Sequence, residues 1–432
     1  MVALAVASAS LLLLLVATAY GRSWYRPAAL VAFGGHLLVS LVVLPRLPYG
    51  WDIAGFHRAA TELAAGAPVT ASRTVSSFAA FQGLLYTAFT PQPATLGVVN
   101  GLLAVLVPIP VAYLADSLYP STEATPAVGI TALFLPLPFL FLTIPMRDTL
   151  SVLLALSLLA VIVRTLRSGA LAGGLPALPL WGMLFLLRSE LALITGLGVL
   201  AVAAVSGVRR LDTNLSLGKF AVMLGSIGAV GFALFARLLY PFDVVNAQLR
   251  GRSRGGAVYL DGMSYSSWAD FLIAAPARAI YFQFTPFPLH VQSVFHLLAF
   301  VGTVSIVVLF VSGARSLVVR EYDERVAVFL GVVYLAGVTG YGTINSNFGT
   351  NVRHRMVFDF LLVVFASPVL HQWWLRLRAW VGVPPGQSGD SDKQQREAQE
   401  FDRRVHSRGQ DPNETHHEDG AETECKRAFL GE

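Results

Sequence analysis

Four short charged segments interrupt an otherwise apolar chain, and their residue types suit anion binding and proton transfer. The segments are Trp51–Arg58, Met146–Asp148, Leu187–Glu190 and Asn351–Arg355. An arginine can hold two phosphate oxygens at once, and a carboxylate can orient or deprotonate a hydroxyl group. Because ionisable groups beside membrane helices are costly unless they serve a function, these four segments are the first candidates for a site.

The composition identifies the class of protein in which these segments must act. The 432 residues are 55% hydrophobic and only 13% charged, and the mean hydropathy is +0.61. These values exclude an ordinary soluble domain and predict an all-α, polytopic transmembrane helical bundle in a cell membrane. The net charge is +5, but the basic residues lie mostly in loops between apolar runs, so no nucleic-acid partner is expected. The single cysteine, Cys425, cannot form an intramolecular disulfide.

Apolar runs long enough to span a bilayer occur at about eleven places, given about 17 to 25 residues per span. Several runs are short or contain proline, so their boundaries are approximate. The expected spans are Val2–Tyr20, Ala28–Leu44, Ala94–Ala115, Pro126–Ile144, Thr149–Val163, Ala170–Leu187, Leu191–Val208, Lys219–Leu239, Ser293–Ser312, Val326–Gly342 and Met356–Leu370.

The basic residues of the short loops predict how these spans are oriented. With the amino terminus outside, the cytoplasmic turns carry most of the loop arginines, except for the turn Asp116–Thr125, which has no basic residue. All four charged segments then lie at the extracytoplasmic face. Residues 1–380 form the membrane domain, and residues 381–432 are so polar that we expect a disordered cytoplasmic tail. The basic residues are Arg22, Arg26, Arg164, Arg167, Arg209, Arg210, Lys219, Arg315, Arg320, Arg325, Arg376 and Arg378.

Two outer loops are long enough to contain helices of their own. In the first, Pro45–Pro93, apolar residues recur at helical spacing over Ile53–Leu63 and again over Phe78–Phe89. In the later loop, Tyr240–His290, the stretch Trp268–Phe284 has the same character. We expect these stretches to lie in the membrane interface as amphipathic helices.

The charged segments together resemble a known enzyme class. Asp52 in the first outer loop, Arg147–Asp148 at a helix end, the Leu-Arg-Ser-Glu break at Leu187–Glu190 and the Gly-Thr-x-x-Arg-x-Arg run at Gly349–Arg355 are similar to features of GT-C membrane glycosyltransferases. The resemblance covers roughly Tyr49–Leu370. The class includes protein O-mannosyltransferases and lipid A aminoarabinose transferases. Its members use sugars carried on polyprenyl phosphate, which implies a hexosyltransferase-type enzyme. This chain departs from the pattern in lacking a second carboxylate beside Asp52 and in having an extra first helix.

Such a transfer needs a carboxylate for the acceptor and cations for the leaving phosphate. Asp52 is the candidate catalytic residue, although aspartate is also a favoured N-cap for a helix starting after it. Arg353, Arg355, Arg147 and Arg188 are the candidate phosphate ligands. Alternatively, the first two contact lipid headgroups and the last two form buried ion pairs. Neighbours one or two apart in a helix are poor partners, so Arg147 and Arg188 are expected to find carboxylates on another helix.

Further charged residues are candidates for support. Asp148 and Glu190 would complete a polar centre, while His57 and His354 could donate to phosphate or relay a proton, or could simply be hydrogen-bonded interfacial side chains. No cofactor is indicated with certainty. Asp52, Asp148 and Glu190 could together hold a divalent cation, but no spacing between them is diagnostic of a metal site.

The resemblance implies a transferase that moves a sugar from a polyprenyl-phosphate donor to a glycan, lipid or protein acceptor at the outer face of the lipid bilayer. A transporter or flippase of a lipid-linked or anionic solute, or a polymerase or ligase of lipid-linked glycans, are the alternatives. A transporter would more naturally show internal repeats and charges near mid-membrane. The chain shows no repeat.

The basic run Arg250–Gly256 is either a lid over the donor phosphate or a loop that binds lipid headgroups.

Overall fold

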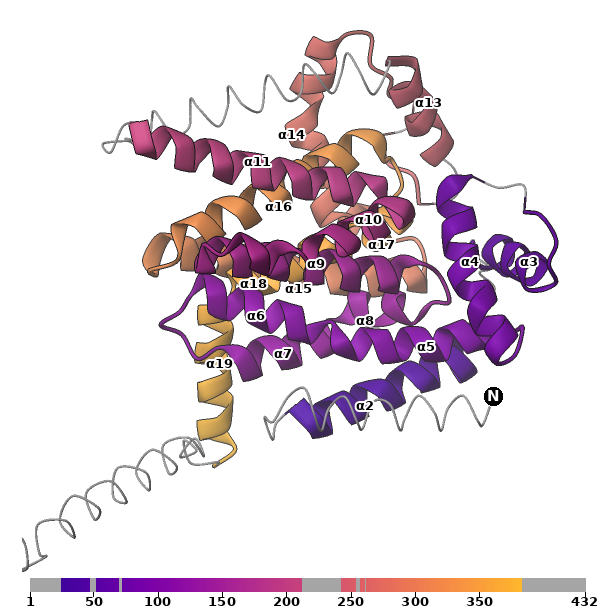
Figure 1. Ribbon diagram of the computed structural model, residues 1–432, viewed down its shortest axis with the longest axis horizontal. Coiled ribbons are helices and arrows are strands. Elements are labelled where there is room, and N and C mark those ends of the chain that lie inside the picture. Colours follow the sequence, from indigo (N-terminus) through magenta and orange to yellow (C-terminus); the bar gives the residue numbers. More distant parts are fainter. Residues whose placement is uncertain are drawn as a thin grey trace, which may run out of the picture. The chain divides into compact units, whose positions relative to one another are not determined.

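The computed structural model describes residues 25–46, 52–69, 72–211, 242–253, 257–260 and 262–382. In these ranges the chain is an all-α bundle whose only β pairing is an isolated bridge between Val258 and Asn347 (Figure 1). The helices are α2 (Tyr25–Leu38), α3 (Ile53–Ala64), α4 (Arg73–Ala88), α5 (Pro93–Leu106), α6 (Pro108–Leu118), α7 (Thr125–Phe134), α8 (Pro136–Thr143), α9 (Asp148–Ser168), α10 (Ala177–Leu187), α11 (Ser189–Leu211), α13 (Phe242–Arg252), α14 (Trp268–Phe284), α15 (Val294–Val319), α16 (Glu324–Ile344), α17 (Phe348–His354), α18 (Met356–Phe365) and α19 (Ser367–Trp380).

Several of these helices are long and apolar enough to cross a membrane, as in a multi-pass membrane protein. Within the described residues six helices qualify, and the number rises to eight if each of two bent helix pairs is one span. The predicted segment Ala170–Leu187 corresponds to a shorter apolar helix, Ala172–Leu187. The expected count of about eleven spans is therefore not confirmed. The expected spans Val2–Tyr20 and Lys219–Leu239, and the tail from residue 383 onward, lie outside the described residues.

Proline accounts for the bend in one of these pairs. The axes of α7 and α8 differ by 56°, and the chain leaves the helical conformation at Leu135, which has φ −62° and ψ 117°. Leu135 precedes Pro136, and the proline ring disfavours the helical conformation in the residue before it. By contrast, Pro108 causes no such break, because at the start of α6 its missing N–H is not needed.

The core of the bundle surrounds α18. Every residue of α18 is buried, as expected for a helix that is apolar except for Asp359. Its neighbours include α6, α15 and α16. Phe358 packs its ring against Phe282 of α14 and Tyr341 of α16, with centroid distances of 6.2 and 6.0 Å. The helix after the charged segment Asn351–Arg355 is thus held in the centre of the bundle.

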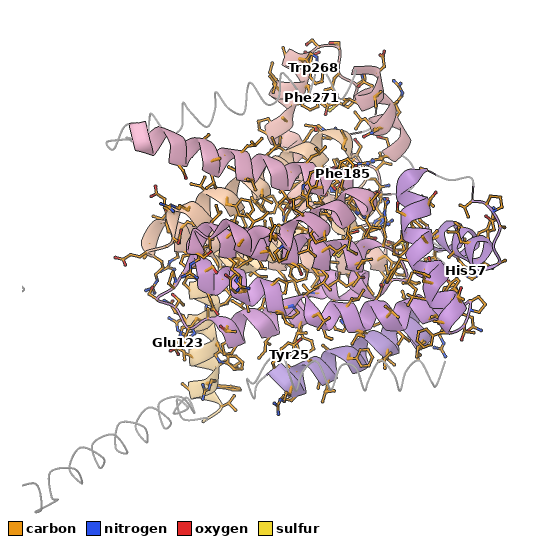
Figure 2. The ribbon with its side chains drawn as sticks, viewed as in Figure 1. Tyr25, His57, Glu123, Phe185, Trp268 and Phe271 are labelled. Atoms are coloured by element: carbon orange, nitrogen blue, oxygen red, sulfur yellow. The ribbon has the colours of Figure 1, made fainter. Side chains whose placement is uncertain are left out.

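The bundle has two polar ends. At one, which we call the turn end, the Asp323 backbone N–H donates to the Leu118 carbonyl at 2.9 Å, joining the start of α16 to the end of α6. At the other, the α3–α4 end, α10 and α16 end and α9 and α11 begin. Figure 2 shows Glu123, in the α6–α7 turn, and His57, in α3, at opposite ends.

All three stretches predicted as interfacial helices are helical. α3 covers the first stripe and is followed by Gly66, whose φ of +76° suits glycine. α3 packs on α4 through an edge-to-face contact between Phe56 and Phe78, with ring centroids 5.2 Å apart. α14 has the predicted limits, Trp268–Phe284, and Figure 2 labels Trp268 and Phe271 at its start.

We predict that Gly342→Ala destabilises the bundle. A Cβ atom at Gly342 would lie 2.7 Å from the carbonyl oxygen of Arg278, a backbone atom of α14 that cannot move aside alone. The expected loss is about 1–3 kcal/mol. Gly331→Ala, in the same helix, is the matched control: its Cβ meets nothing within 4 Å, so it should be neutral or stabilising by up to about 1 kcal/mol. Thermal unfolding in detergent measures both, and equal midpoints would contradict this packing.

The sidedness predicted from the basic loops can be tested with cysteines at the two ends. Ala65, just after α3, and Tyr322, in the α15–α16 turn, are both exposed. With Cys425 replaced by serine, a membrane-impermeant maleimide should label Ala65→Cys in intact cells and Tyr322→Cys only after permeabilisation. The reverse pattern would invert the topology.

Candidate functional site

A polar cavity of about 340 Å³ opens at the α3–α4 end. Its wall contains most of the charged side chains predicted to act together. Guanidinium groups dominate it, joined by two carboxylates, one imidazole and small polar groups. The lining residues are Asp52, Arg147, Arg188, Glu190, Gly251, Arg252, Asn347, Thr350, Arg353 and His354.

Each side chain in this wall sits where a helix begins or ends. Arg147 is the N-cap residue of α9, and Arg188 occupies the break between α10 and α11. Arg353 and His354 form the last turn of α17. Helix ends carry backbone groups without helical partners, so polar side chains there have hydrogen-bonding groups to meet. The four charged segments therefore meet at the cavity because the helix ends that contain them lie together there.

A chain of alternating charges runs through this wall. Asp148 lies beneath the cavity and is 2% exposed. Its Oδ1 forms an ion pair with Nη2 of Arg188. Its second oxygen, Oδ2, accepts a hydrogen bond from Nε of Arg353 at 3.1 Å and forms an ion pair with Nη2 at 3.0 Å. Arg353 Nη1 in turn donates to Asp52 at 3.1 Å. Arg188 thus has the predicted carboxylate partner on another helix, in the buried ion pair considered as the alternative to phosphate binding, whereas Arg147 does not have such a partner among the described residues. Asp148 is the centre of the cluster.

Asp52 occupies the N-cap position of α3 without using its side chain as a cap. Its backbone carbonyl accepts from Phe56 at 3.2 Å, but the carboxylate forms no capping hydrogen bond. Instead it reaches Arg353, and the side chain is 68% exposed. Asp52 was considered as a helix cap and as a catalytic residue. Its side chain does not bind the helix amides and lies at the rim of the cavity.

Arg147 and Glu190 line the cavity without an ion pair between them or to any other described residue. Arg147 donates from Nη1 to the Leu187 carbonyl at 3.2 Å, and its guanidinium carbon lies 5.8 Å from the centroid of the Phe56 ring. Its Nε is buried and lacks a partner within the described residues. Burial and nearby Arg188 lower the pKa of Arg147 to about 10, so it stays cationic near neutral pH. A buried cationic N–H without a protein acceptor is a donor that water or an anionic ligand can satisfy.

His354 is held neutral in the same wall. Its Nδ1 lies 3.3 Å from the amide nitrogen of Asn345, which donates to it. Burial, with the positive charges of Arg188, Arg252 and nearby arginines, lowers its pKa well below the ordinary value of 6.5. The imidazole is therefore a neutral hydrogen-bonding group near physiological pH and contributes no charge to anion binding.

Arg252 lines the cavity, although the sequence indicates it only as part of the basic run Arg250–Gly256. It is the last residue of α13, and its Nη1 donates to the Asn345 side chain at 2.7 Å. The bridge between Val258 and Asn347 joins the segment after α13 to the start of α17. This long-range pairing brings Arg252 to the cavity, and no local sequence pattern indicates it.

Besides Asp148, which lies beneath the cavity, two predicted site residues do not line it. Arg355 is 0% exposed and donates into the core, to the carbonyls of Gln283 and Thr285 at 2.8 and 2.7 Å. The sequence contained a signal for this: residues two apart on a helix point about 200° apart, so Arg353 and Arg355 cannot both face one cavity. His57 lies between α3 and α4, where its Nδ1 is 2.8 Å from the Tyr86 hydroxyl.

Arg278 of α14 positions the cavity wall from behind. It is fully buried and donates to the carbonyls of Gly342 and Asn345 and to the Ser346 hydroxyl. These contacts fix the end of α16 and the residues that lead into α17. Arg278 cannot be recognised as a positioning residue from its local sequence, which does not distinguish it from an interfacial arginine.

The three carboxylates proposed as joint metal ligands are not grouped for that purpose. Within the described residues, no set of three or more His, Cys, Asp or Glu side chains is placed to hold a metal ion. Asp148 is instead occupied by Arg188 and Arg353.

No protein-family model, curated protein or solved structure matches this chain.

We predict that the two carboxylates beside Arg353 differ sharply in their contribution to stability. Asp148→Asn leaves Arg188 and Arg353 with an uncompensated buried charge, which should cost about 3–5 kcal/mol. Asp52→Asn is the matched control, because its carboxylate is exposed and should change the free energy of unfolding by at most about 1 kcal/mol. Chemical unfolding in detergent distinguishes them. Similar losses for both would contradict Asp148 as the buried centre of the cluster.

Proposed function

We propose that this protein is a membrane glycosyltransferase that moves a sugar from a polyprenyl-phosphate donor to a glycan, lipid or protein acceptor at the extracytoplasmic face. The observation that supports it is the meeting of four arginines and two carboxylates around one cavity at the end of an apolar bundle. Guanidinium groups match the oxygens of a phosphate, and a carboxylate matches an attacking hydroxyl. A donor with an apolar tail and an anionic head fits a polar cavity beside membrane helices.

The phosphate-binding group proposed here is Arg147, Arg188, Arg252 and Arg353, which line the cavity. Arg252 replaces Arg355 in the set expected from the sequence. Arg147 is the leading member, because its buried Nε has no partner within the described residues. The others are placed by Asp148 and Asn345, so the donors are oriented before the phosphate arrives. Such preorganised charge stabilises a leaving group without rearrangement during the reaction.

The proposed step is a single displacement. The acceptor hydroxyl oxygen forms a bond to the anomeric carbon on the face opposite the phosphate, and the bond from that carbon to the phosphate oxygen breaks. The hydroxyl proton passes to the Asp52 carboxylate. The electron pair of the broken bond leaves on the phosphate oxygen, which gives a polyprenyl phosphate and inverts the anomeric centre. Glu190, also in the wall, is available to orient sugar or acceptor hydroxyl groups.

The position of the charges favours transfer over transport. The cavity arginines lie at helix ends, whereas a transporter would place its binding groups near the middle of its spans, on discontinuous helices. The bent pairs that could be discontinuous spans, α7–α8 and α18–α19, contribute no residue to the cavity.

Transfer can be tested with reconstituted protein and radiolabelled polyprenyl-phosphate sugars. Asp52→Asn should lower kcat by roughly 10²–10⁴-fold by removing the proton acceptor. Arg147→Ala should weaken donor binding by roughly 10–100-fold, because it removes a charged hydrogen-bond donor.

The matched control is Arg58→Ala, an exposed arginine of α3 that does not line the cavity; it should retain full activity. Undiminished transfer by Asp52→Asn would refute the role of that carboxylate. Movement of labelled lipid across the bilayer by wild-type protein, without any sugar transfer, would refute the enzyme assignment.

A further inference from the structure

Arg353 holds two carboxylates that differ in how firmly they are bound. Toward Asp148 it presents Nε and Nη2, at 3.1 and 3.0 Å, and that carboxylate is 2% exposed. Toward Asp52 it presents Nη1 alone, at 3.1 Å, and that carboxylate is 68% exposed. A buried pair that combines a hydrogen bond with a second close contact is costly to break. An exposed pair contributes little to stability and is weakened by water and salt.

The weaker of these two links lies on the cavity. Arg353 and Asp52 both line it, while Asp148 lies beneath it. Any anion that enters therefore meets Arg353 from the side on which Asp52 is bound. A phosphate offers several oxygens to a guanidinium group, so it is a strong competitor for the Nη1 donor, whereas the Asp148 link is out of its reach.

We infer that a donor phosphate and the Asp52 carboxylate exchange on Arg353: the phosphate takes the Nη1 position and thereby releases Asp52 toward the acceptor. The inference rests on the proposed function for the identity of the anion. While Asp52 is paired, its Oδ2 accepts from Arg353 Nη1, and the side chain is held beside the arginine. Donor binding thus places the phosphate on Nη1 and frees the carboxylate, which is already 68% exposed, to turn toward the acceptor hydroxyl group.

Nothing else in the described residues holds the Asp52 side chain. The carboxylate forms no capping hydrogen bond, and its one ion pair is that with Arg353. Glu190 provides a comparison within the same wall, because it lines the cavity but forms no ion pair with Arg353 or with any other described residue. Exchange on Arg353 therefore concerns Asp52 and not Glu190.

The exchange has an unusual consequence for affinity. Asp52→Asn removes the internal competitor, so the variant should bind a fluorescent polyprenyl monophosphate roughly three- to fivefold more tightly than wild type, although it transfers less sugar. The full-length protein in detergent is titrated with this probe, and the neutral polyprenol serves as the control for binding of the lipid tail alone. Thermal unfolding verifies that each variant is folded.

A double-mutant cycle separates competition from simple net charge. Lysine carries a compact point charge on a flexible stem and lacks the fixed fork by which the guanidinium group holds Asp148 and presents Nη1 to Asp52. In an Arg353→Lys background the Asp52→Asn gain should therefore disappear. Glu190→Gln is the matched control: whatever gain it gives should be the same with arginine or lysine at position 353.

Three results would overturn the exchange. They are an affinity of Asp52→Asn equal to or below that of wild type, a gain that persists in the Arg353→Lys background, and wild-type binding of the phosphate probe no tighter than that of polyprenol. Failure of the proposed function looks different. If the binding cycle behaves as expected but wild-type protein transfers no sugar from any tested donor, then the anion exchange holds and the glycosyltransferase assignment is wrong.

Discussion

The Asp148 carboxylate bridging Arg188 and Arg353 is the interaction on which the rest of the site depends. Asp148 is 40 residues from one partner and 205 from the other in the sequence. Without this arrangement the buried charges of Asp148 and Arg188 and the half-buried charge of Arg353 would be left uncompensated, which a membrane protein interior tolerates poorly. The start of α9, the α10–α11 break and α17 must therefore meet at one place. The cavity is the space that remains above this junction.

From Asp148 outward the charges become steadily more accessible. Arg188 and Asp148 are 6% and 2% exposed, Arg353 is 13% and Asp52 is 68%. Electrostatic links strengthen as water is excluded and weaken where it enters. The inner links thus define a fixed wall, and the outer link is one that a ligand can replace. A site that must bind and release an anion in every cycle needs both properties, and a uniformly buried network would offer only the first.

The sequence indicated the helices well and the directions of their side chains less well. Apolar residues at helical spacing identified α3 and α4, and the limits of Trp268–Phe284 were predicted correctly, because amphipathic periodicity is a local property. The expected orientation of the spans placed the four charged segments at one face, and residues of all four line the cavity. Arg252 could not be predicted, because it reaches the cavity through a pairing between Val258 and Asn347 that joins distant parts of the chain. The number of spans could not be predicted from hydrophobic runs alone, because bent helix pairs and short apolar helices have the same composition as a full span.

The divergence of Arg353 and Arg355 explains how so short a helix as α17 is oriented. Arg353 reaches outward to Asp148 and Asp52, while Arg355 reaches inward to Asp359, 3.5 Å away, and to the carbonyls at the end of α14. A seven-residue helix has little intrinsic stability. Charged anchors on both sides fix its rotation, because turning it to improve one set of contacts would break the other. Arg355 thus serves the cavity without touching it: by holding the inner face of α17, it determines where Arg353 meets a ligand.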